Sequence, residues 1–326
     1  MVITDGKRGP NNGSSHVLDE TISRDRELQE GDSFELTGSK MELHRLGERN
    51  LTVAFQEPFY TTTHLIFGDH RIYVCDTFLG PDSMKEISRI IKENGHQDKP
   101  LVVFNSHADW DHVWGNCFFE DAMILSHREC RNRMIIEWEE ELEKNREFQR
   151  GDVNLARPTY VFDEKYIFED DGIEFFHSPG HTVDSSSCYD QKDKVLFVGD
   201  NVESDIPYVN TLDFDIYIST LENYLARDWT HLVPGHDPVQ TDDTLVRSNI
   251  EYLKNLEEWN VDLKSLTQKG IDVHLYTLSK LAPQVIQSGI QKKAKSQYID
   301  AIEVLKKMEP NEKVTKYENL FRKILG

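Results

Sequence analysis

The stretch Asn105-Ser-His-Ala-Asp-Trp-Asp-His112 decides how this sequence is interpreted. It places two histidines and two aspartates within six positions, directly after the apolar run at residues 101–104. Neutral imidazoles and carboxylates are the ligands that borderline divalent metals prefer. A short turn at the end of a buried strand can bring such side chains to one point. The stretch therefore predicts a metal site at a strand end.

Three further polar residues follow short apolar runs in the same way. They are His181 after residues 173–176, Asp200 after residues 195–198, and His236 after residues 231–233. A glycine immediately precedes each of them, which suits a backbone that must turn sharply as it leaves a strand. We therefore expect four strand ends to place these side chains on one rim.

The rest of the chain predicts an α/β fold with a helical appendage. Apolar runs of strand length begin at residue 51 and include 64–67, 71–75 and 122–125. Amphipathic helices are expected between them, at 83–93 and 128–148, the second with Met134, Ile135, Trp138 and Leu142 on one face. We predict a loose arm at residues 1–40, a metal-binding domain at 41–240, and a helical region at 241–326.

Composition limits the partners. The 326 residues include 37 basic and 58 acidic side chains, a net charge of −21 that repels phosphate backbones and anionic lipid headgroups. We therefore expect a small-molecule substrate and neither nucleic acid nor membrane as a partner. The four cysteines form no CxxC pair, and no export signal or spanning apolar run is present, so reduced thiols and a cytoplasmic location are expected.

With these motifs in this order, the chain resembles the metallo-β-lactamase fold superfamily over about residues 41–240. The resemblance implies an αβ/βα four-layer sandwich that holds two divalent metal ions, expected to be zinc, at its mouth. The positions that match the family's metal ligands are His107, Asp109, Asp111, His112, His181, Asp200 and His236. Asp76 matches an early aspartate that supports the ligands from behind.

One position departs from the family pattern. Asp109 stands where the HxHxDH motif normally has its second histidine. By the family's arrangement, the first metal site would use His107, Asp109 and His181, with Asp200 shared between the sites. The second site, with Asp111, His112 and His236, is complete. An added carboxylate favours iron or manganese more than an all-histidine site does, so these metals are alternatives to zinc.

The resemblance implies a metal-dependent hydrolase. A metal-activated hydroxide would attack an ester, thioester, amide or related bond, with Asp111 orienting it and Asp200 bridging the ions. One alternative is a diiron oxidoreductase of the same fold, acting on oxygen or nitric oxide. Another is a non-catalytic metal-binding member of the family.

Several other residues have less specific interpretations. His64, on the strand before Asp76, is expected to be a packed histidine more often than a ligand. Trp110 and Trp114 flank the motif and could wall the site or belong to the core. The apolar faces of the helices in 241–326 could cap the domain or form a homodimer, and the sequence does not choose between them.

Overall fold

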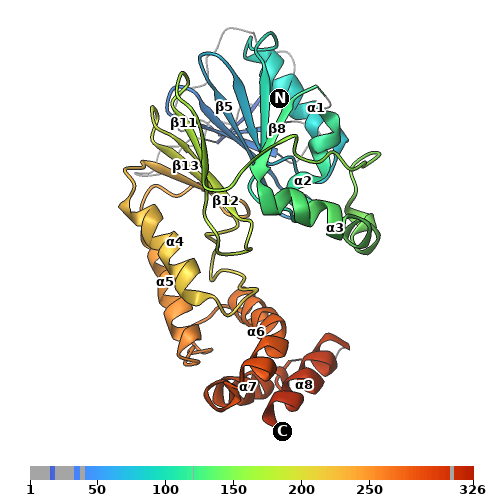
Figure 1. Cartoon of the computed structure of the whole chain (residues 1–326), viewed down its shortest axis with the longest axis vertical. Helices are drawn as coiled ribbons and strands as arrows, with labels where there is room; N and C mark the ends of the chain where they lie inside the picture. Colours follow the sequence, from blue (N-terminus) through green and yellow to red (C-terminus); the bar gives the residue numbers. More distant parts are fainter. Residues whose placement is uncertain (1–14, 19–32, 37–40, 120, 309–311) are drawn as a thin grey trace. The chain divides into compact units, whose positions relative to one another are not determined.

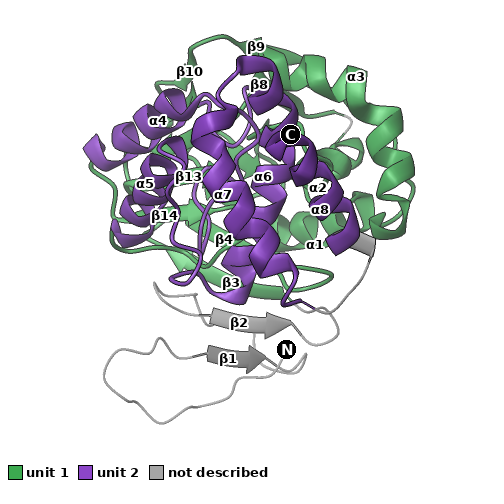
Figure 2. Ribbon diagram, turned by 90° about the horizontal axis from the view of Figure 1, so that it is seen from below, with its two compact units in different colours: residues 1–178, 184–199, 228–242 green, residues 179–183, 200–227, 243–326 purple. Residues whose placement is uncertain are grey.

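The computed structural model describes residues 15–18, 33–36, 41–119, 121–308 and 312–326. The chain divides into two compact units, coloured separately in Figure 2. Unit 1 comprises residues 1–178, 184–199 and 228–242, and unit 2 comprises residues 179–183, 200–227 and 243–326. Unit 2 therefore contains segments from both sides of the boundary predicted at residue 240.

Two β-sheets form the framework of unit 1, and Figure 1 labels several of their strands. In the described part of the chain, the first sheet has the order β1 to β9: β1 (Ser15–Leu18), β2 (Ser33–Leu36), β3 (Met41–Leu46), β4 (Asn50–Phe55), β5 (Thr61–Phe67), β6 (Ile72–Cys75), β7 (Leu101–Asn105), β8 (Met123–His127) and β9 (Tyr160–Phe162). The second has the order β10 to β14: β10 (Lys165–Phe168), β11 (Ile173–His177), β12 (Ser186–Asp190), β13 (Val195–Gly199) and β14 (His231–Pro234).

Strand direction determines which residues share a rim. Strands β2 to β6 pair antiparallel, whereas β6 to β9 pair parallel, and β13 pairs parallel with β14. The carboxyl ends of β6 and β7 therefore lie on one edge, where Asp76 and His107 follow them. A turn at residues 68–71 joins β5 to β6, with Phe67 paired to Ile72.

The first sheet packs on both faces, as period-two alternation requires. Val74 and Val103 point into a cluster with the buried side of α1 (Pro81–Glu93). Their neighbours Tyr73 and Phe104 point the other way, into a core shared with Phe175 and other residues of the second sheet. The predicted α/β class is therefore confirmed, with helix, sheet and sheet stacked in unit 1.

The motif loop continues into helices that pack beside it. They are α2 (Trp110–Val113), the 3₁₀ turn η1 (Trp114–Phe118), α3 (Arg128–Lys144) and the 3₁₀ turn η2 (Arg146–Phe148). In α3, Met134 and Trp138 are buried one turn apart, but Ile135 is 46% exposed. The prediction that Ile135 shares one apolar face with the other three residues was wrong, because the buried stripe of α3 is narrower than the set of apolar residues on that side of the helix.

Unit 2 is helical in its described residues. Its helices are α4 (Phe214–Ala226), α5 (Thr244–Glu257), α6 (Gln268–Ser288), α7 (Gln291–Leu305) and α8 (Glu312–Leu325). The helical character predicted for residues 241–326 is confirmed by α5 to α8. None of the described helices is long and apolar enough to cross a membrane.

The arm predicted at residues 1–40 falls mostly outside the described residues. Within it the structure describes only β1 and β2, which pair with each other and, through β2, with β3. The remaining residues of that prediction lie outside the described part of the chain.

Candidate metal centre

Three predicted ligands converge at one rim of unit 1. Asp111 and His112 lie on α2, the helix that begins within the motif loop, and His236 follows β14. Nε2 of His112 is 3.2 Å from Nε2 of His236, and Oδ2 of Asp111 is 3.3 Å from the same His236 atom. The three ligand atoms all lie within 4.8 Å of one another. Residues about 125 positions apart in sequence thus form one cluster, as expected of strand ends that share a rim.

Asp76 holds His112 from behind. Its backbone adopts a left-handed conformation with φ 60° directly after β6, and its carboxylate is fully buried. Oδ2 lies 2.7 Å from Nδ1 of His112, while Ser106 donates its backbone N–H and hydroxyl to the two oxygens at 2.7 and 2.6 Å. A carboxylate accepts at this contact, so Nδ1 of His112 carries the proton and Nε2 carries a lone pair.

The His236 ring is oriented in the same way by the backbone. Its Nδ1 lies 2.7 Å from the carbonyl oxygen of Tyr60, just before β5. A carbonyl can only accept, so Nδ1 is the donor and Nε2 again carries a lone pair. The Nε2 atoms of His112 and His236 therefore face each other as acceptors, with the Asp111 carboxylate beside them.

This arrangement fits a cation. Two imidazole lone pairs and a carboxylate oxygen at 3.2 to 3.3 Å repel one another electrostatically unless positive charge lies between them. Nitrogen and oxygen donors of this kind suit zinc, and three protein ligands leave a position for water or substrate. The donor set of Asp111, His112 and His236 therefore meets the requirements of a catalytic divalent metal site.

His107 belongs to the same buried loop. Its Nδ1 lies 2.9 Å from the hydroxyl of Ser106, and its ring centroid is 4.3 Å from that of His112. Gly199, at the end of β13, has φ +54°, and a Cβ there would lie 2.7 Å from the Ser106 hydroxyl. Glycine at 199 thus leaves room for the serine that positions both Asp76 and His107.

Asp109 is engaged by an arginine that the sequence analysis did not identify. Oδ1 of Asp109 accepts a hydrogen bond from Nη2 of Arg133 in α3 at 3.0 Å, and Oδ2 is 3.7 Å from Nε2 of His107. The departure from the family motif is therefore accompanied by a positive charge. One oxygen of Asp109 faces the histidine and the other faces the guanidinium.

Arg133 also binds a second carboxylate. Its Nη1 donates to Asp184, which is fully buried and accepts the backbone N–H of Ala108 at 2.9 Å. Burial disfavours the charged guanidinium, but the charges of Asp184 and Asp109 outweigh it and raise the pKa of Arg133. Arg133 thus stays charged and ties the motif loop to the segment after His181.

The remaining predicted ligands, His181 and Asp200, belong to unit 2. Nε2 of His181 and Oδ2 of Asp200 lie 4.0 Å apart. Asn201 accepts the backbone N–H of His181 at 2.9 Å, and Asn210 donates to its carbonyl at the same distance. The structure therefore pairs these two residues with each other on a hydrogen-bonded loop.

An aromatic wall borders His236. The Phe59 ring lies 5.9 Å from that of His236, 5.8 Å from Trp110 and 6.0 Å from Phe148. Trp114, the other tryptophan of the motif, is 1% exposed and belongs to the core. The sequence left open whether Trp110 and Trp114 wall the site or belong to the core, and it gave no signal for Phe59 or Phe148.

His64 is a packed histidine, as expected. It is 1% exposed, lies 3.0 Å from both Thr52 Oγ1 and Asn50 Oδ1, and stacks on Phe197. Burial lowers its pKa to about 3. Its ring is thus committed to the core between the sheets.

The geometry agrees with comparisons to known proteins. The family model described as "Metallo-beta-lactamase superfamily" matches residues 57–260. The chain therefore belongs to the metallo-β-lactamase superfamily. The acyl-coenzyme A thioesterase MBLAC2 of Gallus gallus is 26% identical over 209 residues, which cover 56% of this chain and 76% of the relative.

Solved structures share the fold. The DIM-1 metallo-β-lactamase covers 66% of this chain with 98% of its own length, at a TM-score of 0.52 and 17% identity. A metallo-β-lactamase from Pontibacter korlensis covers 66% of this chain with 99% of its own length, at a TM-score of 0.52 and 18% identity. The predicted αβ/βα sandwich with a C-terminal helical appendage is thereby confirmed.

Proposed function

We propose that this protein is a metal-dependent hydrolase that cleaves a thioester bond in a small molecule. The observation that carries the proposal is the cluster of Asp111, His112 and His236, in which two imidazole lone pairs and a carboxylate converge. The similarity to an acyl-coenzyme A thioesterase supports thioesters among the bonds that the fold can hydrolyse.

The side chains around the cluster have separate roles in this proposal. A divalent ion held there, which we propose to be zinc, would acidify a bound water and polarise the substrate carbonyl. Asp76 keeps the Nδ1 proton on His112, so that Nε2 remains a ligand. Asp111, whose side chain is 13% exposed, can orient the attacking water. Phe59 and Trp110 provide apolar surface that limits the access of bulk water.

We further propose a first metal site that uses His107, Asp109 and His181, with Asp200 bridging the two sites. Sequence order supports it, since His181 and Asp200 follow strands β11 and β13 as in the family pattern. Arg133 competes with a metal ion for Asp109, because it donates to Oδ1 at 3.0 Å. We therefore expect the first site to be the weaker one.

The same contact bears on the diiron alternative. That hypothesis depends on Asp109 adding negative charge and oxygen ligation for iron or manganese. The guanidinium of Arg133 offsets this charge, so the observation that motivated the redox alternative weighs less, and hydrolysis is the function we favour. Dimerisation through residues 241–326 and a cytoplasmic location stay predictions.

The test combines metal content with thioester cleavage. Protein expressed with zinc, iron and manganese available is analysed by elemental mass spectrometry, and thiol release is followed from acyl-coenzyme A thioesters of increasing chain length. His236→Ala is expected to lose the metal of the second site and at least about a thousandfold in turnover, since the bound metal activates the water.

The matched control is His231→Ala, which removes an imidazole five residues earlier, from β14, the strand that His236 follows. It is expected to keep both metal and turnover. Turnover in His236→Ala close to the wild-type value would contradict the proposal. Two irons per chain together with oxygen consumption would replace it by the redox alternative.

A further inference from the structure

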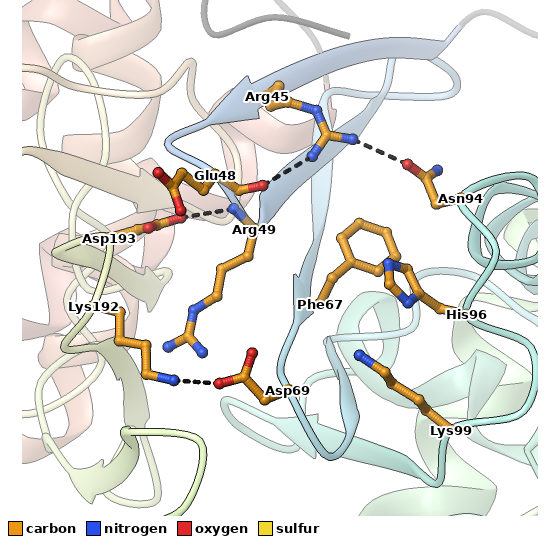
Figure 3. A pocket seen from close by; sticks show the side chains of 10 residues that line it. All are labelled: Arg45, Glu48, Arg49, Phe67, Asp69, Asn94, His96, Lys99, Lys192 and Asp193. Carbon is orange, nitrogen blue, oxygen red and sulfur yellow. Dashed lines mark hydrogen bonds and ion pairs between the residues drawn. The ribbon is translucent and has the colours of Figure 1, made fainter. Parts of the chain in front are cut away.

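A polar cavity lies in unit 1, outside the metal cluster. Its volume is about 350 Å³, and Figure 3 shows the side chains that line it. They come from the β3–β4 turn, the β5–β6 turn, the end of α1 and the β12–β13 turn. The cavity is within the size range of sites for small molecules.

The cavity and the metal cluster are at opposite ends of β5. Thr61, the first residue of this strand, contacts His236, whereas Phe67, its last residue, lines the cavity. Seven residues at about 3.3 Å each separate these positions by roughly 20 Å. The cavity is therefore too far from Asp111 to hold the reacting bond of a substrate in the metal cluster.

The lining gathers positive charge in an acidic protein. Four cationic side chains from three segments line it: Arg45, Arg49, Lys99 and Lys192. Three acidic residues, Glu48, Asp69 and Asp193, accompany them. In a chain of net charge −21, four cations around one cavity are a local exception, and the three acidic lining residues together with Asp190, the partner of Arg49, balance their charge.

Arg49 is the deepest of these cations. It is 9% exposed, and its Nε and Nη2 both donate to the buried carboxylate of Asp190. Its Nη1 is buried with no hydrogen-bond acceptor among the described residues. A buried donor without an acceptor is costly, so this guanidinium favours an additional acceptor beside it.

The nearby carboxylate of Asp193 is committed elsewhere. Its Oδ2 accepts the backbone N–H of Arg49 at 2.8 Å and the side-chain amide of Asn50 at 3.0 Å. Lys99 donates to the carbonyl of Gly68 at 2.6 Å, which leaves two further N–H donors on its ammonium. The cavity thus has donors in excess of the acceptors that hold them.

Asp69 is the loosely held anion of the group. Its side chain is 66% exposed, and its Oδ2 accepts a hydrogen bond from Nζ of Lys192 at 2.6 Å. Figure 3 marks this pair with a dashed line. The hydrogen bond from Lys192 lowers the pKa of Asp69, so the carboxylate is ionised at neutral pH. Exposed pairs of this kind are weak. A ligand anion could therefore take over Lys192 and displace Asp69 at little cost.

One wall of the cavity is aromatic. The rings of Phe67 and His96 stack with centroids 4.9 Å apart and an interplanar angle of 29°. Burial, together with the charges of Lys99 and Arg45, lowers the pKa of His96 and keeps its ring neutral. This wall offers an apolar surface for the organic part of a ligand.

We propose that this cavity binds the phosphate group of a small molecule, with Arg49, Lys99 and Lys192 as its donors. A phosphate dianion supplies the acceptors that these cations lack, and Arg and Lys are the side chains that proteins use for it. The volume beyond the phosphate leaves room for a ring against Phe67 and His96.

Calorimetric titration tests the proposal with three probes: inorganic phosphate, adenosine monophosphate and adenosine. We expect inorganic phosphate to bind with a dissociation constant of about 10 mM or lower, which is typical of a weak site. Adenosine alone is expected not to bind. Tighter binding of adenosine monophosphate than of phosphate would show that the ring wall contributes, and equal binding would assign the site to free phosphate.

Two double variants separate the site from net charge. Lys99→Ala/Lys192→Ala removes two donors, and binding is expected to weaken at least about tenfold, because charge-assisted hydrogen bonds are lost. Lys165→Ala/Lys264→Ala removes two exposed lysines outside the cavity and should leave binding unchanged. Equal loss in both variants would overturn the proposal, as would the absence of phosphate binding in the wild type.

A third variant predicts a gain, which misfolding cannot imitate. Asp69→Asn removes the competing carboxylate and releases Lys192, so phosphate should bind several-fold more tightly. Weaker binding in Asp69→Asn would contradict the proposed site. Because phosphate can also bind a metal ion, each titration is repeated in the His236→Ala background. Loss of all binding there would assign the phosphate to the metal cluster and overturn the proposal.

Discussion

The two ends of the sheets in unit 1 carry opposite chemistry on the same framework. At one rim, His112, His236 and Asp111 bring acceptors within 3.2 to 3.3 Å of one another. At the other rim, Arg49 and its neighbours gather donors, including the buried Nη1 of Arg49, which has no acceptor among the described residues. The first arrangement fits a cation, and we propose that the second binds an anion.

The two rims differ in the charged groups that surround a buried ion pair. Each rim has an arginine paired with a fully buried aspartate: Arg133 with Asp184, and Arg49 with Asp190. At the metal rim the arginine offsets an excess of carboxylates. At the other rim the aspartate pairs with one of the four cations that line the cavity. One kind of buried ion pair thus serves two sites of opposite sign.

The largest expected effect is at the metal rim. Asp111→Asn keeps the shape of the side chain but removes its charge, and turnover should fall about a thousandfold, since the variant loses both a ligand and the group that orients water. Thiol release and metal content measure this. Asp152→Asn, at an exposed aspartate, is the control. Phosphate binding at the opposite rim should not change in either variant, and a parallel loss would mean that the rims are not independent.

The next effect compares the two arginines. Arg133→Gln and Arg49→Gln each leave a buried carboxylate without its partner, so each should lower the free energy of unfolding by about 3 kcal/mol. Urea unfolding measures this loss. Only Arg133→Gln should also raise the metal content per chain, because it releases Asp109. An unchanged metal content would show that Arg133 does not compete for Asp109.

A smaller effect is expected from the support behind His112. Asp76→Asn replaces the acceptor of the Nδ1 proton, and such changes typically weaken metal binding by about 10- to 100-fold. Competition with a chromogenic chelator measures the affinity. The control is Asp171→Asn, which also alters a fully buried aspartate of unit 1, one that bonds Tyr73. Equal losses in both variants would point to general destabilisation.

Sequence alone reached the metal rim but not the opposite one. The predicted ligands follow strands, each of the last three directly after a glycine, and this placement predicted that they share one rim. The resemblance to the family supplied the grouping of Asp111, His112 and His236. The cavity has no such signal, because its lysines and arginines come from three separate segments: the β3–β4 hairpin, the loop before β7 and the β12–β13 turn. Charged residues in turns are ordinary in sequence, and only the fold brings them together.

Sequence analysis also missed the partner of one motif residue. Asp109 was identified as a departure, yet its effect depends on Arg133, which lies 24 positions later on a helix with many charges. On the same helix the prediction for Ile135 was wrong: this residue is exposed, although it is apolar and its helical position places it beside the buried face. Helical periodicity locates a buried stripe to within one position, and tertiary packing decides which edge residues it includes.

The smallest effect tests the strand that joins the two rims. His64 lies in the middle of β5, and its Nε2 is 3.0 Å from the oxygen of Asn50, whose amide in turn donates to Asp190. The Asn50 oxygen accepts, so the neutral ring has its proton on Nε2 and accepts the Thr52 hydroxyl at Nδ1. Protonation of the ring would place a second donor in this fully packed network.

Burial lowers the pKa of His64 to about 3 in the folded protein, whereas an unfolded histidine titrates near 6.5. As the pH falls below about 6.5, the unfolded chain binds a proton that the folded chain refuses, so stability is lost progressively down to about pH 3. The loss at pH 5 should be about 2 kcal/mol.

His64→Gln cannot titrate, so its free energy of unfolding should fall by about 2 kcal/mol less between pH 7 and pH 5 than that of the wild type. Other titrating groups are the same in both proteins and cancel in the difference. His70→Gln removes an exposed imidazole from the turn that follows the same strand and should keep the wild-type slope. If the free energy of unfolding of His64→Gln falls between pH 7 and pH 5 as steeply as that of the wild type, protonation of His64 does not cause the loss of stability.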